Sequence, residues 1–496
     1  MPIQVSLGAL KDLSKLAAVP AYDPARLKAG ILHFGVGNFH RAHQAVYLDD
    51  LFNLGLDHDW ALVGAGVRPP DEAMRQKLQS QDWLTTVVEL EADRSTARVT
   101  APMVDYLKVG AAAAIIAKLA DPAIRIVSLT ITEGGYYIDP ASQRFDPKHP
   151  DIVADAADLL TRPKTVFGLI LAGLKRRRDT GIGPFTVMSC DNIPGNGHVT
   201  QNAVVGLAQL IYPELAAWVK TNVAFPNGMV DRITPATSDR ERQLLADNFG
   251  IADAWPVFCE NFRQWVLEDD FPAGRPALEK VGVQFVDDVA PFELMKIRIL
   301  NGGHATIAYP AALMDIHFVH EAMENELVRG LLDKVERDEI IPVVPPVPDT
   351  NLGDYYRLIV QRFSNPKIGD TVTRLCLDGS NRQPKFILPS AADRLKARQS
   401  VTGLALVSAL WARYCFGETD SGQPIAPNDP NWTRLTAQAK RTRDNPRAWL
   451  EMTDIFGELA NNPIYVAAFS HALTTLWSIG TRATLEAYLE GQLLGT

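Results

Sequence analysis

Cysteine is scarce in this sequence, and its four copies are widely spaced. They stand at Cys190, Cys259, Cys376 and Cys415 among 496 residues, and no two of them form a C-x-x-C pair. This spacing argues against both a disulfide framework and a structural zinc site. We interpret the four side chains as buried or half-buried thiols of a protein that works in a reducing compartment.

Long apolar runs and an excess of positive charge are also absent. The longest apolar runs, such as GLILAGL at 168–174, are too short to span a bilayer. The N-terminal stretch MPIQVSLGALKDLSKL lacks the apolar core of a secretory signal. A formal net charge of −9 argues against nucleic acid or an anionic membrane as the main partner. We therefore expect a cytoplasmic protein that acts on a small molecule.

The first part of the chain alternates between apolar runs and helical patterns. We expect strands at 30–34, 60–67, 124–132 and 184–190. We expect helices between them at 38–53, 106–120 and 165–181. The runs at 84–91 and 97–102 are typical of an antiparallel pair. The alternation predicts an α/β fold with a Rossmann-like, doubly wound parallel sheet whose two faces are both covered.

The pattern changes after about residue 286, beyond which helical patterns dominate. We expect helical blocks at 320–337, 353–363, 391–415, 432–441, 446–460 and 462–490. The length allows two or three domains, each with a full core. We therefore predict a nucleotide-binding domain at 1–286 and a mostly α-helical domain at 287–496.

The stretch HFGVGNFHRAH, residues 33–43, follows the first strand and opens a helix. Gly35 and Gly37 make the G-x-G start of a dinucleotide fingerprint, but His40 stands where a third glycine or alanine is usual. Gly35 suits a tight turn, Gly37 suits the close approach of a pyrophosphate, and the helix N-terminus attracts the anion. We predict phosphate binding here, with Arg41 adding charge. An ordinary strand-to-helix turn is the alternative.

The end of the second strand bears on the choice of cofactor. Asp71 could hold the adenosine ribose and would repel the 2′-phosphate of NADP. Alternatively, it is a helix N-terminal acid favoured by the helix dipole. Arg68 lies close by and could accommodate a 2′-phosphate, so the residues leave both interpretations open.

Histidine spacing does not favour a metal site. His40 and His43 are three residues apart, and two ligands are too few. HFVHE at 317–321 has the order H-x-x-H-E, whereas zinc hydrolases carry H-E-x-x-H or H-x-x-E-H. We predict no metal.

The stretch PFELMKIRILNGGHATIAY, residues 291–309, is the most informative for chemistry. On an α-helix with Lys296 at zero, Glu293 lies at about 60°, His304 at about 80° and Asn301 at about 140°. Four different polar side chains among apolar ones predict a lined pocket, and an amphipathic helix with a buried ion pair is the alternative. A lysine among apolar neighbours can act as a general base, and amides can donate to an oxyanion.

Two further polar clusters follow strands. They are SCDNIPGNG at 189–197 and NGMVDR at 227–232. Open α/β sheets place their sites at the carboxyl ends of strands. Each cluster alone is nevertheless more typical of a turn.

At these residues the sequence resembles the polyol-specific long-chain dehydrogenases. The landmarks cover nearly the whole chain, and they are HFGVGNFHRAHQA (33–45), SLTITEGGY (128–136), TVMSCDNIPGNG (186–197), FPNGMVDRITP (225–235), WVLED (265–269), KIRILNGGH (296–304) and FSNPKIGD (363–370). The resemblance implies metal-independent oxidation of a polyol to a ketose with NAD, and D-mannitol and D-fructose are the expected pair. D-arabinitol, D-glucitol or a hexuronate such as fructuronate are alternative substrates, and a non-catalytic NAD-binding regulator is a remote alternative. The resemblance also implies a monomer or a weak oligomer.

The resemblance assigns roles residue by residue. Lys296 matches the general base, and Asn192 and Asn301 match the amides of the oxyanion site. His304 matches a residue that orients the substrate, and Glu293 one that gates proton exchange. The expected substrate contacts are Asp231, Arg374 and Arg382, the last standing where relatives can carry lysine. The expected cofactor contacts are Phe34, Gly35, Gly37, Phe39, His40, Arg41 and Asp71.

Overall fold

The structure is a computed structural model, and it describes residues 1–139, 144–159 and 162–493. The chain forms two compact units, Met1–Ala290 and Pro291–Thr496.

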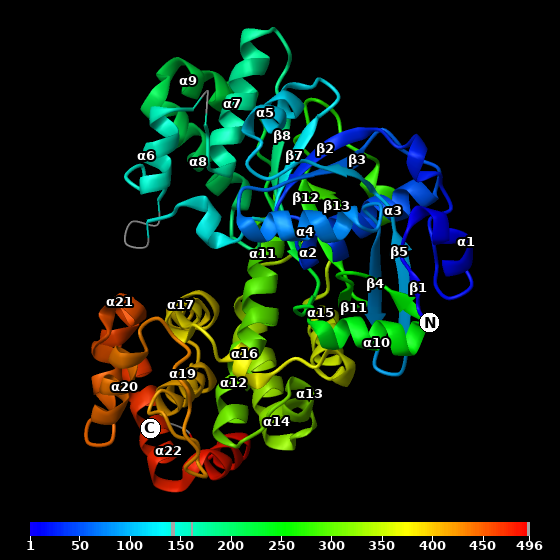
Figure 1. Ribbon diagram of the computed structural model, residues 1–496. Helices are drawn as coiled ribbons and strands as arrows, with labels where there is room; N and C mark the ends of the chain where they lie inside the picture. The colour runs from blue at the N-terminus through cyan, green and yellow to red at the C-terminus, as the bar shows by residue number, and fades with distance from the viewer. Residues whose placement is uncertain (140–143, 160–161, 494–496) are drawn as a thin grey trace. The chain divides into compact units, whose positions relative to one another are not determined.

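A five-stranded parallel sheet lies at the centre of the first unit (Figure 1). Its strands, in spatial order, are β6 (Met103–Tyr106), β3 (Ala61–Ala65), β2 (Ala29–Phe34), β7 (Ile126–Leu129) and β8 (Thr186–Ser189). All four neighbouring pairs are parallel, which confirms the predicted α/β, Rossmann-like class. The order reverses between β2 and β7, and open sheets of this kind bind ligands at that point.

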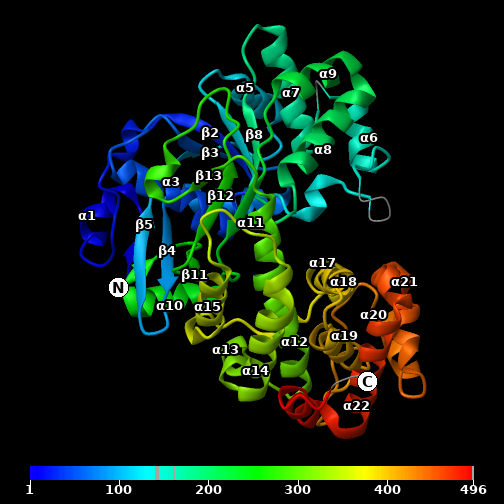
Figure 2. The same cartoon turned by 180° about the vertical axis from the view of Figure 1, so that it is seen from behind.

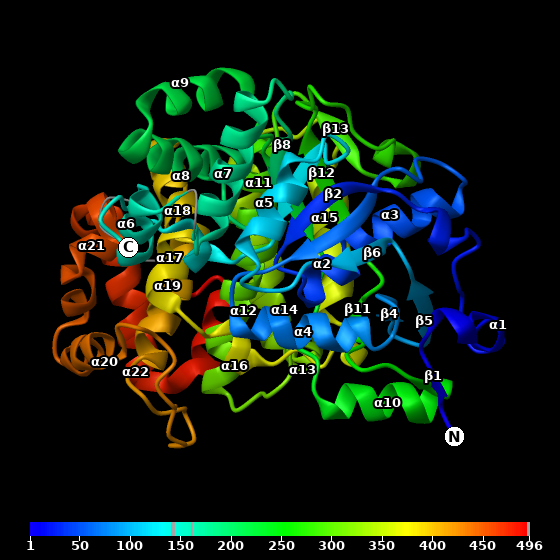
Figure 3. The same ribbon diagram turned by 45° about the horizontal axis from the view of Figure 1, so that its top comes forward.

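Helices cover the sheet, and most of its strand residues are buried. Every residue of β3, β7 and β8 is buried. The main core cluster joins β2, β7 and β8 to α5 (Ala112–Ala120), α7 (Val166–Asp179), α8 (Asn196–Ile211) and α9 (Pro213–Asn222). Figure 3 shows α7 and α8 beside β8. The unit's other helices are α1 (Leu10–Leu13), α2 (Asn38–Ala42), α3 (Gln44–Asn53), α4 (Pro69–Gln79), α6 (Pro150–Ala157) and α10 (Asp239–Phe249).

Smaller sheets flank the central one. The predicted antiparallel pair is confirmed as β4 (Thr85–Leu90) and β5 (Ser95–Thr100), with β11 (Val257–Glu260) parallel to β4. A second sheet holds β9 (Gly228–Asp231), β12 (Gln264–Glu268) and β13 (Gln284–Val286). The short strands β1 (Ile3–Gln4) and β10 (Ile251–Ala252) pair with each other.

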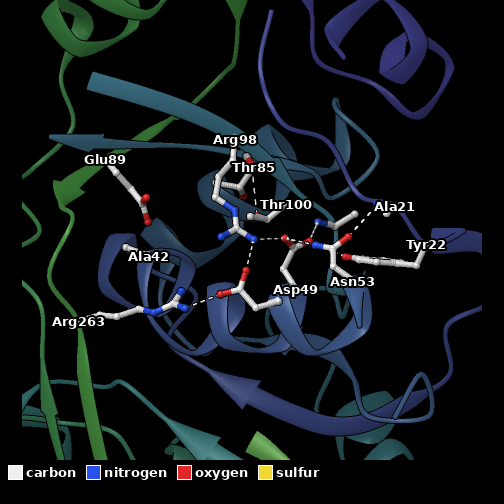
Figure 4. Close-up of polar contacts among 12 residues, drawn as sticks. Ala21, Tyr22, Ala42, Asp49, Asn53, Thr85, Glu89, Arg98, Thr100 and Arg263 are labelled. Carbon is white, nitrogen blue, oxygen red and sulfur yellow. Dashed lines mark hydrogen bonds and ion pairs between the residues drawn. The ribbon is translucent and has the colours of Figure 1, made fainter. Parts of the chain in front are cut away.

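An ionic network fixes α3 to β5 (Figure 4). Arg98 of β5 donates to Asp49 and, at 2.6 Å, to Asp50. Tyr22 donates to Asp49 at 2.7 Å, and Arg263 donates to Asp50. Because Asp49 is buried, these donors compensate a carboxylate that would otherwise be costly to desolvate. The helix α3, which follows α2, is therefore held against β5.

The second unit is helical. Its core joins α12 (Gly302–Leu313), α14 (Glu326–Val335), α19 (Thr402–Tyr414) and α22 (Pro463–Leu489), and Figure 2 shows α22 against α19. Its other α-helices are α11 (Ala290–Met295), α13 (Val319–Glu324), α15 (Leu352–Phe363), α16 (Val372–Leu375), α17 (Gly379–Phe386), α18 (Leu388–Lys396), α20 (Trp432–Arg441) and α21 (Thr453–Phe456). None of the helices in the described ranges is long and apolar enough to cross a membrane.

Several predicted helices are interrupted in the structure. The helix predicted at 38–53 breaks at His43, whose backbone is non-helical. The block at 391–415 is two helices, because Arg398 adopts a left-handed conformation and ends the first. α22 is kinked at Gly480, where the Asp420 carboxylate accepts from the Thr481 N–H. The block at 446–460 is mostly 3₁₀-helix.

Candidate functional site

The glycine loop after β2 combines a closely packed residue with an open one. Gly35 has φ +92°, and a Cβ built on it would lie 2.0 Å from the Thr130 carbonyl oxygen, so only glycine fits. A Cβ on Gly37 would meet only the Gly35 carbonyl oxygen, at 3.8 Å. The backbone is therefore tightly packed at Gly35 and open at Gly37, directly before the first residue of α2.

His40 and Arg41 point into the protein from α2. Both are buried, and Arg41 donates to the Trp255 carbonyl oxygen at 2.6 Å and to Asn38 Oδ1 at 2.8 Å. The His40 ring stacks on His33 with centroids 3.5 Å apart. Arg41 thus supports the loop from inside, and its direct contact with a phosphate stays a prediction.

The two aromatic residues assigned to the cofactor differ in exposure. Phe34 is fully buried at the end of β2. Phe39 is half-buried and stacks on the His43 ring at 4.8 Å. Their contacts with a cofactor stay predictions.

Asp71 caps the helix that follows β3. Its Oδ2 accepts from the Val67 and Arg68 N–H groups, both at 2.9 Å. This is the helix N-terminal role that the sequence left open. Asp71 Oδ2 is thereby fixed beside the end of β3. The role of Asp71 toward a ribose stays a prediction.

Two asparagines lock the turns after β8 and before β9 to each other. Asn196 donates to the Gly228 carbonyl oxygen at 2.8 Å and accepts from the Gly228 N–H at 2.9 Å. Asn227 in return accepts from the Gly197 N–H at 2.9 Å. The clusters at 189–197 and 227–232 therefore form one structure. It presents Asn192 on an exposed stretch and Asp231 in a buried position at the end of β9.

Lys296 lies at the start of a π-helix in the second unit. Lys296–Asn301 is π-helical and joins α11 to α12 without interruption, so Glu293, Lys296, Asn301 and His304 share one helical stretch (Figure 1). The angles derived from α-helical winding are wrong across this segment, because a π-helix is wider. Lys296 is buried, whereas Glu293 and Asn301 are half-buried. Single π-helical turns within α-helices are frequent at functional sites.

Gly302 and Gly303 lie in close-packed surroundings. A Cβ on Gly302 would lie 3.3 Å from the Phe386 carbonyl oxygen. A Cβ on Gly303 would lie 3.3 Å from Glu336 Oε1 and 3.4 Å from the Phe363 ring. The glycines cost roughly 1 kcal/mol each in helix propensity relative to alanine, and this tight fit explains their presence.

His304 is held as a neutral imidazole. Its ring stacks on Phe363 with centroids 4.1 Å apart and an interplanar angle of 14°. Burial, and then the charges of Arg374, Arg362 and Arg382, lower the pKa of His304 well below its usual value. A neutral imidazole offers one donor and one acceptor, which suits a hydroxyl group.

The predicted arginines lie around His304. Arg374 donates from Nε to Asp370 Oδ1 at 2.5 Å, and Arg382 donates to the Leu375 carbonyl oxygen at 2.9 Å. Arg362 and Phe363 were not among the predicted site residues. Phe363 begins the landmark FSNPKIGD, whereas Arg362 lies outside it. Among the described residues, no group of three histidine, cysteine, aspartate or glutamate side chains could hold a metal ion.

Comparison with known proteins covers both units. Residues 29–280 match the model of the mannitol dehydrogenase Rossmann domain, and residues 288–477 match that of the mannitol dehydrogenase C-terminal domain. The chain is 63% identical over 471 residues to the mannitol 2-dehydrogenase of Cereibacter sphaeroides, covering 95% of this chain and 98% of that protein.

Two solved structures are similar over almost the whole chain. One is the Pseudomonas fluorescens mannitol 2-dehydrogenase in ternary complex with NAD and D-mannitol, with 44% identity, a TM-score of 0.87, and coverage of 98% of this chain and 100% of that one. The other is a D-sorbitol dehydrogenase in substrate-free form, with 34% identity, a TM-score of 0.90, and coverage of 97% and 100%.

Proposed function

Because this chain belongs to the mannitol dehydrogenase family, we propose that it is an NAD-dependent polyol dehydrogenase that interconverts D-mannitol and D-fructose. The observation that carries the proposal is the helical stretch on which Glu293, buried Lys296, Asn301 and His304 follow one another. Residues 1–286 act as the NAD-binding domain and residues 287–496 as the substrate and catalytic domain.

The glycine loop is suited to the cofactor. The open backbone at Gly37 would receive the pyrophosphate, and Asp71 would disfavour a 2′-phosphate through its negative charge. Phe34, Phe39, His40 and Arg41 shape the same loop. NAD, when bound, accepts a hydride from the carbinol carbon.

Proton transfer is the task of the second unit. Lys296 takes the hydroxyl proton during oxidation and returns it, as an ammonium group, during reduction. Asn192 and Asn301 donate hydrogen bonds to the substrate oxygen as negative charge develops on it. Glu293 controls exchange of the proton with solvent.

Substrate hydroxyl groups are held by neutral and charged side chains. Neutral His304 orients the hydroxyl beside the reacting carbon. Asp231, Arg374 and Arg382 contact the remaining hydroxyl groups.

A panel of ketoses reduced with NADH tests the proposed reaction. We expect D-fructose to give the highest kcat/KM, and NADPH to lower kcat/KM by about tenfold or more because Asp71 repels its 2′-phosphate. Initial rates of NADH and NADPH oxidation provide the measurement. A marked preference for fructuronate or another carboxylated sugar would overturn the mannitol assignment. NADH binding without turnover of any ketose would favour a regulator.

A second candidate is a dehydrogenase for another alditol, D-glucitol or D-arabinitol. Arg382, where relatives can carry lysine, and the similarity to a D-sorbitol dehydrogenase favour it. The same panel, extended to the oxidation of the three alditols, separates the candidates.

Gly37→Ala tests the cofactor loop. Because the added methyl group would make only an ordinary van der Waals contact, with the Gly35 carbonyl oxygen at 3.8 Å, we expect an unchanged Tm but a Kd for NADH raised by about tenfold or more through a clash with the pyrophosphate. Fluorescence titration with NADH measures the Kd. Gly183→Ala is the matched control, because its Cβ meets nothing within 4 Å, and it should leave both quantities unchanged. An unchanged Kd in Gly37→Ala would refute the proposal that the pyrophosphate binds at this loop.

A further inference from the structure

Asp191 is a buried carboxylate that directly precedes Asn192. It is 8% exposed, whereas its neighbour Asn192 is exposed. Oδ2 accepts from the Ile131 N–H at 2.9 Å and from the Tyr136 hydroxyl at 2.7 Å, and Oδ1 accepts from the Thr132 N–H at 2.9 Å. The carboxylate therefore joins the loop after β8 to the loop after β7.

The loop after β7 contains an unusual backbone conformation. Thr132 has φ 64° and ψ 164°, a region that glycine populates and that a β-branched residue adopts only under constraint. The N–H group of this residue donates the hydrogen bond that Asp191 Oδ1 accepts. Strained residues of this kind persist where surrounding contacts over-determine them, and they cluster at functional sites.

The same loop is bound to the glycine loop at its other end. The Thr130 N–H donates to the Phe34 carbonyl oxygen at 2.9 Å, and Thr130 Oγ1 donates to the Gly35 carbonyl oxygen at 2.6 Å. Residues 130–132 thus connect the glycine loop to Asp191. They do so at the point between β2 and β7 where the strand order reverses.

We propose that Asp191 is a positioning residue that sets the Asn192 amide in register with the glycine loop through residues 130–132. The inference rests on the proposed function, because it takes Asn192 as an oxyanion donor and the glycine loop as the cofactor site. Hydride transfer requires the cofactor and the oxyanion donor in one fixed arrangement, and a small displacement of either is costly in rate. The Asp191 side chain fixes the position of Asn192 relative to the glycine loop, and all the residues involved belong to the first unit.

Asp191→Asn tests the proposal with a change of one atom. A carboxamide cannot accept from donors on both sides, because its Nδ2 is itself a donor. We expect kcat for D-fructose reduction to fall about 30-fold or more with little change in KM, since an oxyanion donor acts mainly in the transition state. An unchanged kcat would overturn the proposal.

Asp155 provides a matched control for loss of a buried carboxylate. It is fully buried and accepts from the Lys164 N–H at 2.7 Å, the Thr165 N–H at 2.9 Å and Thr165 Oγ1 at 2.6 Å. Its donors therefore match those of Asp191: two successive backbone N–H groups and one hydroxyl. Asp155→Asn should lower Tm but keep kcat within about twofold, because it is not bonded to either loop of the proposed site. A comparable loss of kcat in both variants would make the effect of Asp191→Asn merely structural.

A double-mutant cycle with Asn192→Ala separates the positioning role of Asp191 from the oxyanion role of Asn192. We expect Asn192→Ala alone to lower kcat by about 10²-fold, and the double variant to be no slower than Asn192→Ala. If the loss of kcat in the double variant equals the product of the two single losses, the positioning role of Asp191 is overturned and the proposed function stands. Full activity in Asn192→Ala would instead refute the oxyanion role on which both depend.

Discussion

Replacing Lys296 with alanine is expected to lower kcat for D-mannitol oxidation by about 10³-fold, within the range that general acid–base catalysis supplies. The reason is that Lys296 is buried at the start of the π-helix and is the proposed acceptor of the hydroxyl proton. Because alanine leaves the amides of the oxyanion site in place, residual activity should remain. Steady-state NADH production at saturating substrate provides the measurement.

The control for this variant is Lys385→Ala, which removes an exposed lysine from α17 and should leave kcat unchanged. Added methylamine is expected to restore part of the activity of Lys296→Ala, since a small amine can take the vacated position and accept the proton. An alanine variant that retained most of its turnover would refute the assignment of the general base.

Acid is expected to destabilise the first unit steeply below about pH 6.5, because three neighbouring histidines are buried as neutral rings. Burial lowers the pKa of His33 and of His43 to about 3, and lowers that of His40 well below its usual value of 6.5. At a pH below the usual histidine pKa of 6.5 but above the lowered pKa of the folded state, the unfolded chain binds protons that the folded chain does not. Each histidine then removes about 1.4 kcal/mol of stability per pH unit, up to about 4 kcal/mol per unit for the three.

Urea denaturation at pH 7.5, 6.5, 5.5 and 4.5 measures this dependence. The free energy of unfolding should fall by about 1 kcal/mol between the first two values through these groups, and more steeply below pH 6.5. His40→Leu should reduce the slope by about 1.4 kcal/mol per pH unit, because one titration is lost. His471→Gln replaces an exposed histidine and should leave the slope unchanged. A flat profile down to pH 4.5 would mean that the buried rings are already protonated in the folded protein.

Local patterns were sufficient for much of the fold. Strands that are apolar throughout and end in glycine or polar residues report a parallel sheet, because both of its faces are buried. β2, β3, β7 and β8 lie where this pattern placed them. β2 begins one residue earlier than predicted, and the other three strands are shorter than their apolar runs. Helix ends were predicted less well. His43, Arg398 and Gly480 interrupt helical patterns for reasons that lie in tertiary contacts or in the backbone conformation of one residue.

The candidate site divides in the same way. The helical stretch that carries Glu293, Lys296, Asn301 and His304 was readable from spacing, because residues near one another in sequence share a helix. Its π-helical winding was not readable, because that winding depends on what packs against the helix.

The sequence by itself determined the parallel α/β class, the glycine loop and the order of polar residues on the helix of Lys296, since each depends on residues close together in the chain. Only the tertiary structure decided that Arg41 faces inward, that Asp71 caps α4, and that Asn196 and Asn227 lock two distant turns together. The same holds for Asp191, whose three donors come from a loop 55 to 60 residues away. Buried polar groups must find hydrogen-bond partners, and which partners they find is set by how the strands are ordered in space.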